Sequence, residues 1–252
     1  MLSFLRAVAE ARAERIERLP GDLGVALFAD SLPLVHDQNL VYAAPGLQEA
    51  DLPLLAEQVE AVQGAAALRH RKVAFEDEAD CRAHERWFRR HGWRPRPLRL
   101  MVHHGPEPDA GAVRFAEEVD PHGLTAAAHA YASEEPWGRS PEARRQVVAG
   151  DDLTRRAVSE RAFGVRQGDS IVAYCRLYSR EGIGQIENVT TLAAHRRRGY
   201  SRSLVSLALR ASLPEHSLTF LVAEGTDWPR HFYARMGFQD VGSYCEFTRL
   251  GG

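Results

Sequence analysis

A basic turn between a strand and an amphipathic helix constrains this chain more than any other feature. The stretch Ile186 to Leu192 is rich in β-branched residues, and His195-Arg-Arg-Arg-Gly-Tyr-Ser201 follows it closely. Apolar residues then recur at helical spacing, at Leu204, Leu207, Ala208 and Ala211. Because a helix N-terminus carries unpaired amides and partial positive charge, this order predicts an anion site where the helix begins.

The simplest alternative is that the arginine run is an exposed turn without a ligand. The chain has 32 Lys and Arg against 34 Asp and Glu, a formal charge of -2, so charge that binds phosphate has to be local. This balance disfavours a nucleic-acid binder. The choice between a bare turn and an anion site therefore depends on the surrounding sequence.

That surrounding sequence resembles a known superfamily. The family's first motif is Arg or Gln, two residues, Gly, one residue, then Gly or Ala, and Arg196, Gly199 and Ser201 stand at those positions. Serine is a departure, although it is small enough for close backbone approach. Downstream, Phe232-Tyr-Ala-Arg-Met-Gly-Phe238 is similar to the second motif, in which an aromatic residue precedes Tyr and Gly-Phe ends the helix. The chain thus resembles the GNAT superfamily of N-acetyltransferases.

The resemblance implies acetyl-CoA as cofactor and assigns the residues that hold it. The strand that carries Val189 and Thr191 would splay from its neighbour and pair through main-chain groups with the pantetheine arm. The amides of the basic turn would enclose the pyrophosphate, with the arginine side chains as further partners. The expected cofactor-binding residues are Val189, Thr191, Arg196, Arg197, Arg198, Gly199, Tyr200 and Ser201.

Acetyl transfer to an amine also requires a neutral nucleophile and a proton source for the departing thiolate. An alkylammonium of pKa near 10.4 loses its proton at pH 7 at a cost of about 4 to 5 kcal/mol. Glu187, beside the expected thioester, is the first candidate for the base, although strand alternation also permits it to face solvent. Tyr233 corresponds to the family tyrosine that faces the CoA sulfur, and packing in the core is its alternative role.

The N-terminal half contains a weaker copy of the second motif. Trp87-Phe-Arg-Arg-His-Gly-Trp93 matches the segment that ends at Phe238 in its aromatic pair, arginine, glycine and final aromatic residue. This half has no basic glycine turn between Ala43 and Ala50, and Phe88 stands in the place of Tyr233. We therefore expect a degenerate GNAT-like domain at residues 1–104, a linker at 105–111 and a catalytic GNAT domain at 112–252.

The expected fold class is α/β (α+β), with two GNAT-like mixed-sheet domains, each a central, mostly antiparallel sheet flanked by helices. Periodicity predicts helices at residues 2–19, 49–62, 79–91, 124–133, 141–148, a stretch ending at 213, and 228–236. Thr226 or Asp227 is expected to cap the last of these. Strands are predicted at residues 23–29, 34–43, 72–76, 97–103, 113–118, 161–166, 171–178, 184–192, 218–223 and 244–250.

Cysteine usage and hydropathy indicate the compartment. Cys81, Cys175 and Cys245 are few and widely spaced, so we interpret them as reduced core thiols and expect neither a disulfide framework nor a metal site. Arginines and glutamates stand near the start, where a signal peptide needs an uninterrupted apolar stretch, so we expect no signal peptide. Nowhere in the sequence do about 18 apolar residues run together. We expect a cytoplasmic protein without a membrane partner, monomeric or homodimeric.

The function expected from the sequence is acetyl-CoA-dependent N-acetylation of a primary amine, by direct attack in a ternary complex. The acceptor is a small molecule or peptide that the sequence does not identify. The alternative is a regulatory protein that binds acyl-CoA without transferring the acyl group, because Ser201 departs from the family pattern and strand alternation also permits Glu187 to face solvent.

Overall fold

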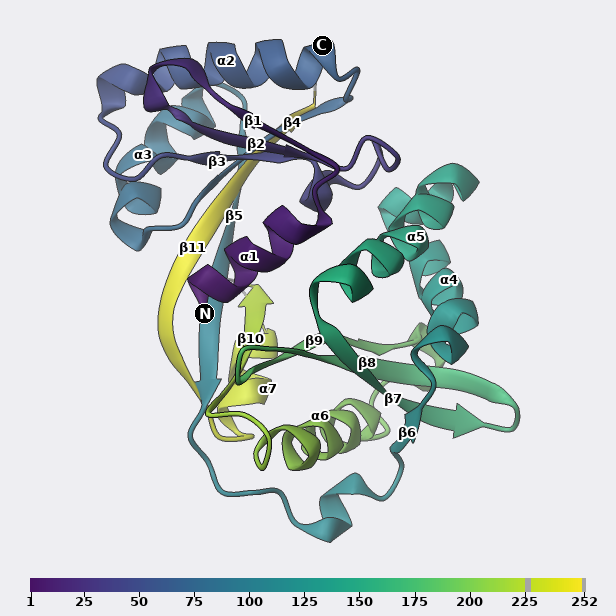
Figure 1. The fold of residues 1–252 in the computed structure, drawn as a ribbon. Helices are drawn as coiled ribbons and strands as arrows, with labels where there is room; N and C mark the ends of the chain where they lie inside the picture. The colour runs from purple at the N-terminus through teal and green to yellow at the C-terminus, as the bar shows by residue number, and fades with distance from the viewer. Residues whose placement is uncertain (225–227, 251–252) are drawn as a thin grey trace. The chain divides into compact units, whose positions relative to one another are not determined.

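The computed structural model describes residues 1–224 and 228–250, which form a mixed α/β structure (Figure 1). Its helices are α1 (Leu2–Arg12), α2 (Leu52–Ala65), α3 (Glu78–Arg90), α4 (Thr125–Glu134), α5 (Pro141–Ala157), α6 (Tyr200–Ser212) and α7 (Trp228–Ala234). Its strands are β1 (Arg15–Arg18), β2 (Gly24–Phe28), β3 (Leu40–Ala43), β4 (His70–Phe75), β5 (Arg94–His103), β6 (Glu117–Val119), β7 (Ser159–Gln167), β8 (Ser170–Arg180), β9 (Ile183–Thr191), β10 (Leu218–Glu224) and β11 (Phe238–Leu250).

The chain divides into two compact units. The N-unit contains residues 2–101 together with 222–234 and 240–252, and the C-unit contains residues 102–221 and 235–239. The last strand of the chain and α7 belong to the N-unit in this division. The expected domains at residues 1–104 and 112–252 stay a prediction.

The N-unit is built on a mixed sheet in the order β1-β2-β3-β4-β11-β5. Its first three strands are antiparallel, and β3 and β4 are parallel. Strand β11 pairs antiparallel with β4, with Cys245 opposite Phe75 and Leu250 opposite His70. In this strand order, β11 therefore lies between two strands, β4 and β5, that come from the first 103 residues.

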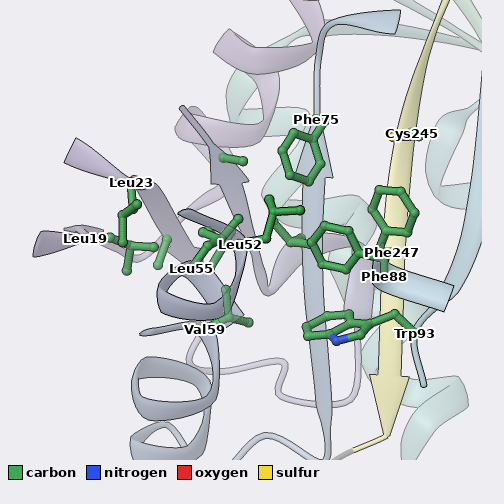
Figure 2. Packing of buried hydrophobic residues seen from close by; sticks show 14 of the residues in the cluster. Leu19, Leu23, Leu52, Leu55, Val59, Phe75, Phe88, Trp93, Cys245 and Phe247 are labelled. Carbon is green, nitrogen blue, oxygen red and sulfur yellow. The ribbon is translucent and has the colours of Figure 1, made fainter. Parts of the chain in front are cut away.

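The hydrophobic core of the N-unit involves α2, α3 and the buried side chains of the sheet (Figure 2). Leu52, Leu55 and Val59 are spaced by three and four residues, so they line one buried face of α2. Phe88 of α3 stacks on Phe247 of β11, with ring centroids 4.2 Å apart. Because each such side chain contributes roughly 1.5 to 3 kcal/mol when fully buried, this core ties β11 firmly to the N-unit.

A disulfide joins Cys81 of α3 to Cys245 of β11, whose Cα atoms are 5.8 Å apart. The expectation that these two cysteines are reduced thiols is therefore wrong, and reduced cysteines no longer argue for a reducing compartment. The pair is 164 positions apart in sequence and becomes adjacent through the packing of α3 and β11. Cys175 is a buried free thiol as expected, and burial raises its pKa.

The strands of the C-unit follow the order β10-β9-β8-β7-β6. Its strands pair antiparallel except β9 and β10, which are parallel. Helix α6 lies on one face of these strands, and α4 and α5 lie on the other (Figure 1). Leu204, Val205, Ala208 and Leu209 of α6 are fully buried. The expected strand and helix of the anion site therefore both belong to this unit.

The two halves of the chain repeat one topology. The order β1-β2-β3-α2-β4-α3-β5 corresponds to β7-β8-β9-α6-β10-α7-β11, with the same parallel pairing after the third strand. The matching motifs end alike, because Gly92 and Gly237 have positive φ values of 81° and 89° and precede buried aromatic residues. Left-handed glycine is the usual helix terminator. This repeated order is what a duplicated unit predicts.

The predicted elements differ from the structure mainly at their ends. The first helix stops at Arg12, and the edge strand β1 follows it; both lie within the single helix predicted for residues 2–19. The strand predicted at 34–43 is only β3, because a short 3-10 helix occupies His36–Gln38. Helix α5 extends to Ala157, and β6 begins only at Glu117. The expected cap at Thr226 or Asp227 lies outside the described residues.

No helix within residues 1–224 and 228–250 combines the length and the apolarity needed to cross a bilayer.

Replacing Cys81 and Cys245 together by serine should lower the free energy of unfolding of the N-unit by about 2 to 4 kcal/mol, because the cross-link closes a long loop in the unfolded chain. Urea denaturation followed by circular dichroism measures this. A reductant should destabilise the wild-type protein and leave the double variant unchanged. Equal stability of the wild type with and without reductant would contradict the cross-link.

Candidate functional site

Strand β9 is irregular on both of its sides. In its register with β8, Asn188 and Val189 stand opposite the single residue Cys175, and Asn188 takes a φ of 54°. An extra residue in this conformation is a β-bulge. The parallel register with β10 ends at Gln185, so β10 does not pair with the described residues of β9 beyond that point. The later part of β9 therefore has a main-chain edge that an extended ligand could join as an added strand.

Helix α6 begins directly after the basic turn, at Tyr200. Gly199 precedes it in the left-handed conformation, with a φ of 83°, which glycine adopts without steric cost. In this part of the described chain, no side chain caps the helix and its first turn has no acidic residue. The first amides of a helix have no intrahelical acceptor, so this end offers donors and partial positive charge to an anion.

The arginines of the turn are exposed. Arg196 donates to the Thr191 carbonyl at 3.1 Å and lies 3.5 Å from the carboxylate of Glu134. Arg198 donates to a carbonyl within the turn at 3.4 Å, and Arg197 has a positive φ of 63°. Arg196 therefore stiffens the junction between strand and turn, and all three guanidinium groups add positive charge near the α6 N-terminus.

Ser201 lies at the position where the family pattern has Gly or Ala. Its hydroxyl is 3.1 Å from the Thr191 hydroxyl, so it links the end of β9 to the first turn of α6. The neighbouring Tyr200 is buried, with 6% of its surface exposed, and its ring meets Phe115 edge-on at 5.3 Å. Tyr200 is thus a packing residue whose main-chain amide alone is placed to meet an anion.

Glu187 is half-buried on β9 and stands opposite Arg176 of β8. Its Oε2 accepts a hydrogen bond of 2.6 Å from Gln185. Arg176 is itself buried between Glu160 of β7 and Asp151 of α5, with 2.5 Å between Arg176 and the Asp151 carboxylate. Burial raises the pKa of Asp151, against the influence of Arg176. Glu187 therefore lies beside a buried ion cluster on the α5 side of the sheet.

Sequence reasoning did not find this cluster. Its members come from a helix and two strands, at positions 151, 160 and 176, and charged residues at such spacing give no local pattern. An arginine within an otherwise apolar strand, in Ile171 to Leu177, was the one available signal.

Tyr233 lies on α7, where its ring meets that of Phe232 at 5.1 Å between centroids. The side chain is half-buried. Helix α7 belongs to the N-unit, whereas β9 and the start of α6 belong to the C-unit. The expected position of Tyr233 opposite a CoA sulfur therefore stays a prediction, as does the role of Glu187 as base.

The corresponding turn in the N-terminal half, between β3 and α2, has a different chemistry. There the Asp51 carboxylate accepts the Gln48 amide at 2.8 Å, and the Asp80 carboxylate accepts the Gly46 amide at 3.0 Å. These carboxylates occupy donors and bring negative charge to the helix start. An anion would be repelled at this turn.

Within the described ranges, no three His, Cys, Asp or Glu side chains gather in a way that could hold a metal ion.

Known families and structures contain clear counterparts of this fold. Residues 124–238 match the family model of the Acetyltransferase (GNAT) family. This range includes β9, the basic turn, α6 and the second motif. The chain matches no curated protein.

Several solved structures cover nearly the whole chain. A functionally unknown conserved protein from Staphylococcus epidermidis is 13% identical with a TM-score of 0.71, covering 95% of this chain and 94% of that one. A GCN5-related N-acetyltransferase from Kribbella flavida is 19% identical with a TM-score of 0.60, covering 98% and 96%. A tandem GNAT protein from the clavulanic acid biosynthesis pathway is 13% identical with a TM-score of 0.54, covering 84% and 74%. At such identities the likeness establishes the fold.

Replacing Gly199 by valine should raise the dissociation constant of acetyl-CoA roughly tenfold, about 1.4 kcal/mol, because a β-branched residue is strained in this conformation and blocks close backbone approach. Isothermal titration calorimetry measures the effect. Gly168→Val is the matched control, since Gly168 also has a positive φ, of 59°, in the turn between β7 and β8. Equal affinity of the Gly199 variant and the wild type would refute the anion site.

Proposed function

We propose that this chain transfers the acetyl group of acetyl-CoA to a primary amine of a small molecule or peptide. The match of residues 124–238 to the GNAT acetyltransferase family supports this activity. The observation that carries the proposal is the uncapped N-terminus of α6 beside the bulged, open edge of β9. One extended ligand with an anionic group would satisfy both sets of main-chain groups.

The residues present fit acetyl-CoA at this place. The amides of Tyr200, Ser201 and Arg202 would bind the pyrophosphate, with the exposed guanidinium groups of Arg196 to Arg198 around it. Gly199 keeps the approach free of a side chain. The main-chain groups of Val189 and Thr191 would pair with the amides of the pantetheine arm, although the Thr191 carbonyl also accepts from Arg196. When bound, the cofactor supplies an activated acetyl thioester.

Glu187 would accept the proton of the attacking amine. Its strand lies next to the proposed thioester position, and its side chain is on the α5 side of the sheet, half-buried beside Arg176. The Gln185 amide holds one carboxylate oxygen at 2.6 Å, which orients the group. In direct attack within a ternary complex, no residue of the protein is acylated.

Tyr233 would return a proton to the departing sulfur, and the Val189 amide, exposed by the bulge, would donate to the carbonyl oxygen of the acetyl group. A preorganised amide donor of this kind typically contributes about 3 to 4 kcal/mol to transition-state stabilisation. Proton donor, oxyanion donor and base would then be three separate groups.

Release of CoA thiol, measured with acetyl-CoA and a panel of amino acids, polyamines, aminoglycosides and peptides, tests the proposed activity. We expect amine-dependent release with at least one class of acceptor. Tight binding of acetyl-CoA without turnover on any of these amines would instead indicate a regulatory protein that binds acyl-CoA.

With an accepted amine in hand, Glu187→Gln should lower kcat roughly a hundredfold and leave the dissociation constant of acetyl-CoA unchanged, because general base catalysis typically contributes about 10² to 10⁴. Raising the pH should narrow the difference, since more of the amine is then already neutral. Glu181→Gln, at an exposed carboxylate in the turn between β8 and β9, is the matched control. A Glu187 variant as active as the wild type at pH 7 would remove the base from the mechanism.

Tyr233→Phe should reduce turnover more than it reduces cofactor affinity, because the hydroxyl acts on the departing thiolate and not on the bound ground state. Steady-state kinetics and calorimetry on the same preparation separate the two quantities. Unchanged turnover would leave Tyr233 with a packing role alone.

A further inference from the structure

The segment that enters the C-unit runs along α6 from its last turn to its first. Near the C-terminal end of α6, Arg210 donates to the Pro108 carbonyl at 2.9 Å. Near the N-terminal end, the buried hydroxyl of Ser203 accepts the amides of Phe115 and Ala116, both at 3.1 Å. The segment is thus fastened at both ends, and it brings residue 115 to the helix start.

Phe115 is held there by its main chain, and much of its ring is left open. The side chain is 38% exposed. One ring edge lies next to the anion turn, since a Cβ built on Gly199 would be 3.9 Å from the Phe115 ring. The ring also meets buried Tyr200 edge-on, with the ring centroids 5.3 Å apart. An aromatic surface therefore stands beside the first turn of α6.

Arg114 adds a cation to this surface. Its guanidinium lies over one face of the Phe115 ring, 4.4 Å from the centroid, and its side chain is exposed. A base would therefore stack on the other face of the ring. The arginine turn at 196–198 and the exposed Arg202 lie on or next to the same helix start. An aromatic ring and guanidinium groups at an anion site suit a nucleotide, because a base stacks on the ring and a phosphate binds arginine.

We propose that Phe115 and Arg114 form the subsite for the nucleotide end of the cofactor, with adenine on the Phe115 ring and the 3′-phosphate on Arg114. The inference rests on the proposed binding of acetyl-CoA and adds residues outside both GNAT motifs. It gives the segment before β6 a role in cofactor affinity in addition to connecting the two halves of the chain.

Calorimetry with two ligands tests this subsite. Acetyl-CoA contains the nucleotide, whereas S-acetyl-4′-phosphopantetheine lacks it. Phe115→Ala should raise the dissociation constant of acetyl-CoA roughly tenfold, as loss of one base–aromatic stack does, and leave that of the shorter ligand unchanged. Phe115→Trp should keep the wild-type affinity, and its fluorescence should be quenched by acetyl-CoA only. Trp137→Ala, at another exposed aromatic residue of the C-unit, should change neither constant.

The 3′-phosphate is tested separately with 3′-dephospho-acetyl-CoA. Arg114→Gln should weaken the binding of acetyl-CoA and leave the affinity for 3′-dephospho-acetyl-CoA unchanged. An equal loss for acetyl-CoA and the phosphopantetheine ligand in Phe115→Ala, or no loss at all, would overturn the subsite while cofactor binding stands. A wild-type protein that binds neither ligand would overturn the proposed function and the subsite together.

Discussion

Main-chain hydrogen-bonding groups need partners, and two features of the C-unit bring such groups together at one place. The bulge at Asn188 and Val189 interrupts the register of β9 with β8, and the pairing of β9 with β10 ends at Gln185. A few residues later, α6 starts without a side-chain cap. The proposed site depends on these two features, the later edge of β9 and the uncapped start of α6, because an extended ligand with a phosphate group complements both.

Side chains hold the end of β9 and the start of α6 in position. Arg196 binds the last carbonyl of β9, and the hydroxyls of Thr191 and Ser201 join the strand to the helix. Serine therefore contributes a contact that the glycine or alanine of the family pattern cannot make. The same helix fastens the Phe115 segment through Ser203, so α6 positions the anion site and the proposed nucleotide subsite alike.

The two halves of the chain show how topology can persist after chemistry has diverged. Both have antiparallel strands followed by a helix and a parallel strand. In the N-terminal half, the equivalent turn is filled by its own carboxylates, Asp51 and Asp80. Strand β11 pairs with β4 of this half, and the Cys81–Cys245 disulfide joins β11 to α3. That this half is a degenerate copy with a structural role stays a prediction.

Local patterns in the sequence predicted most elements and the order of the site, because periodicity and turn chemistry act over a few residues. The basic turn, the start of α6 and the strand before it follow from residues 186–213 alone. Contacts between residues that are far apart in the sequence could not be predicted in this way. They are the disulfide, the place of β11 in the N-unit, and the Arg176 cluster beside Glu187. Short elements such as β1 were missed too, since four residues at a sheet edge carry little periodicity.

Hydrogen–deuterium exchange with and without acetyl-CoA tests the central claim most directly. Ligand should protect the amides of Val189 and of Tyr200 to Arg202, and leave the corresponding turn at Gly46 to Leu52 unchanged. Exchange at β9 and α6 that is the same with and without saturating ligand would contradict the proposed site, as would protection confined to the N-terminal turn.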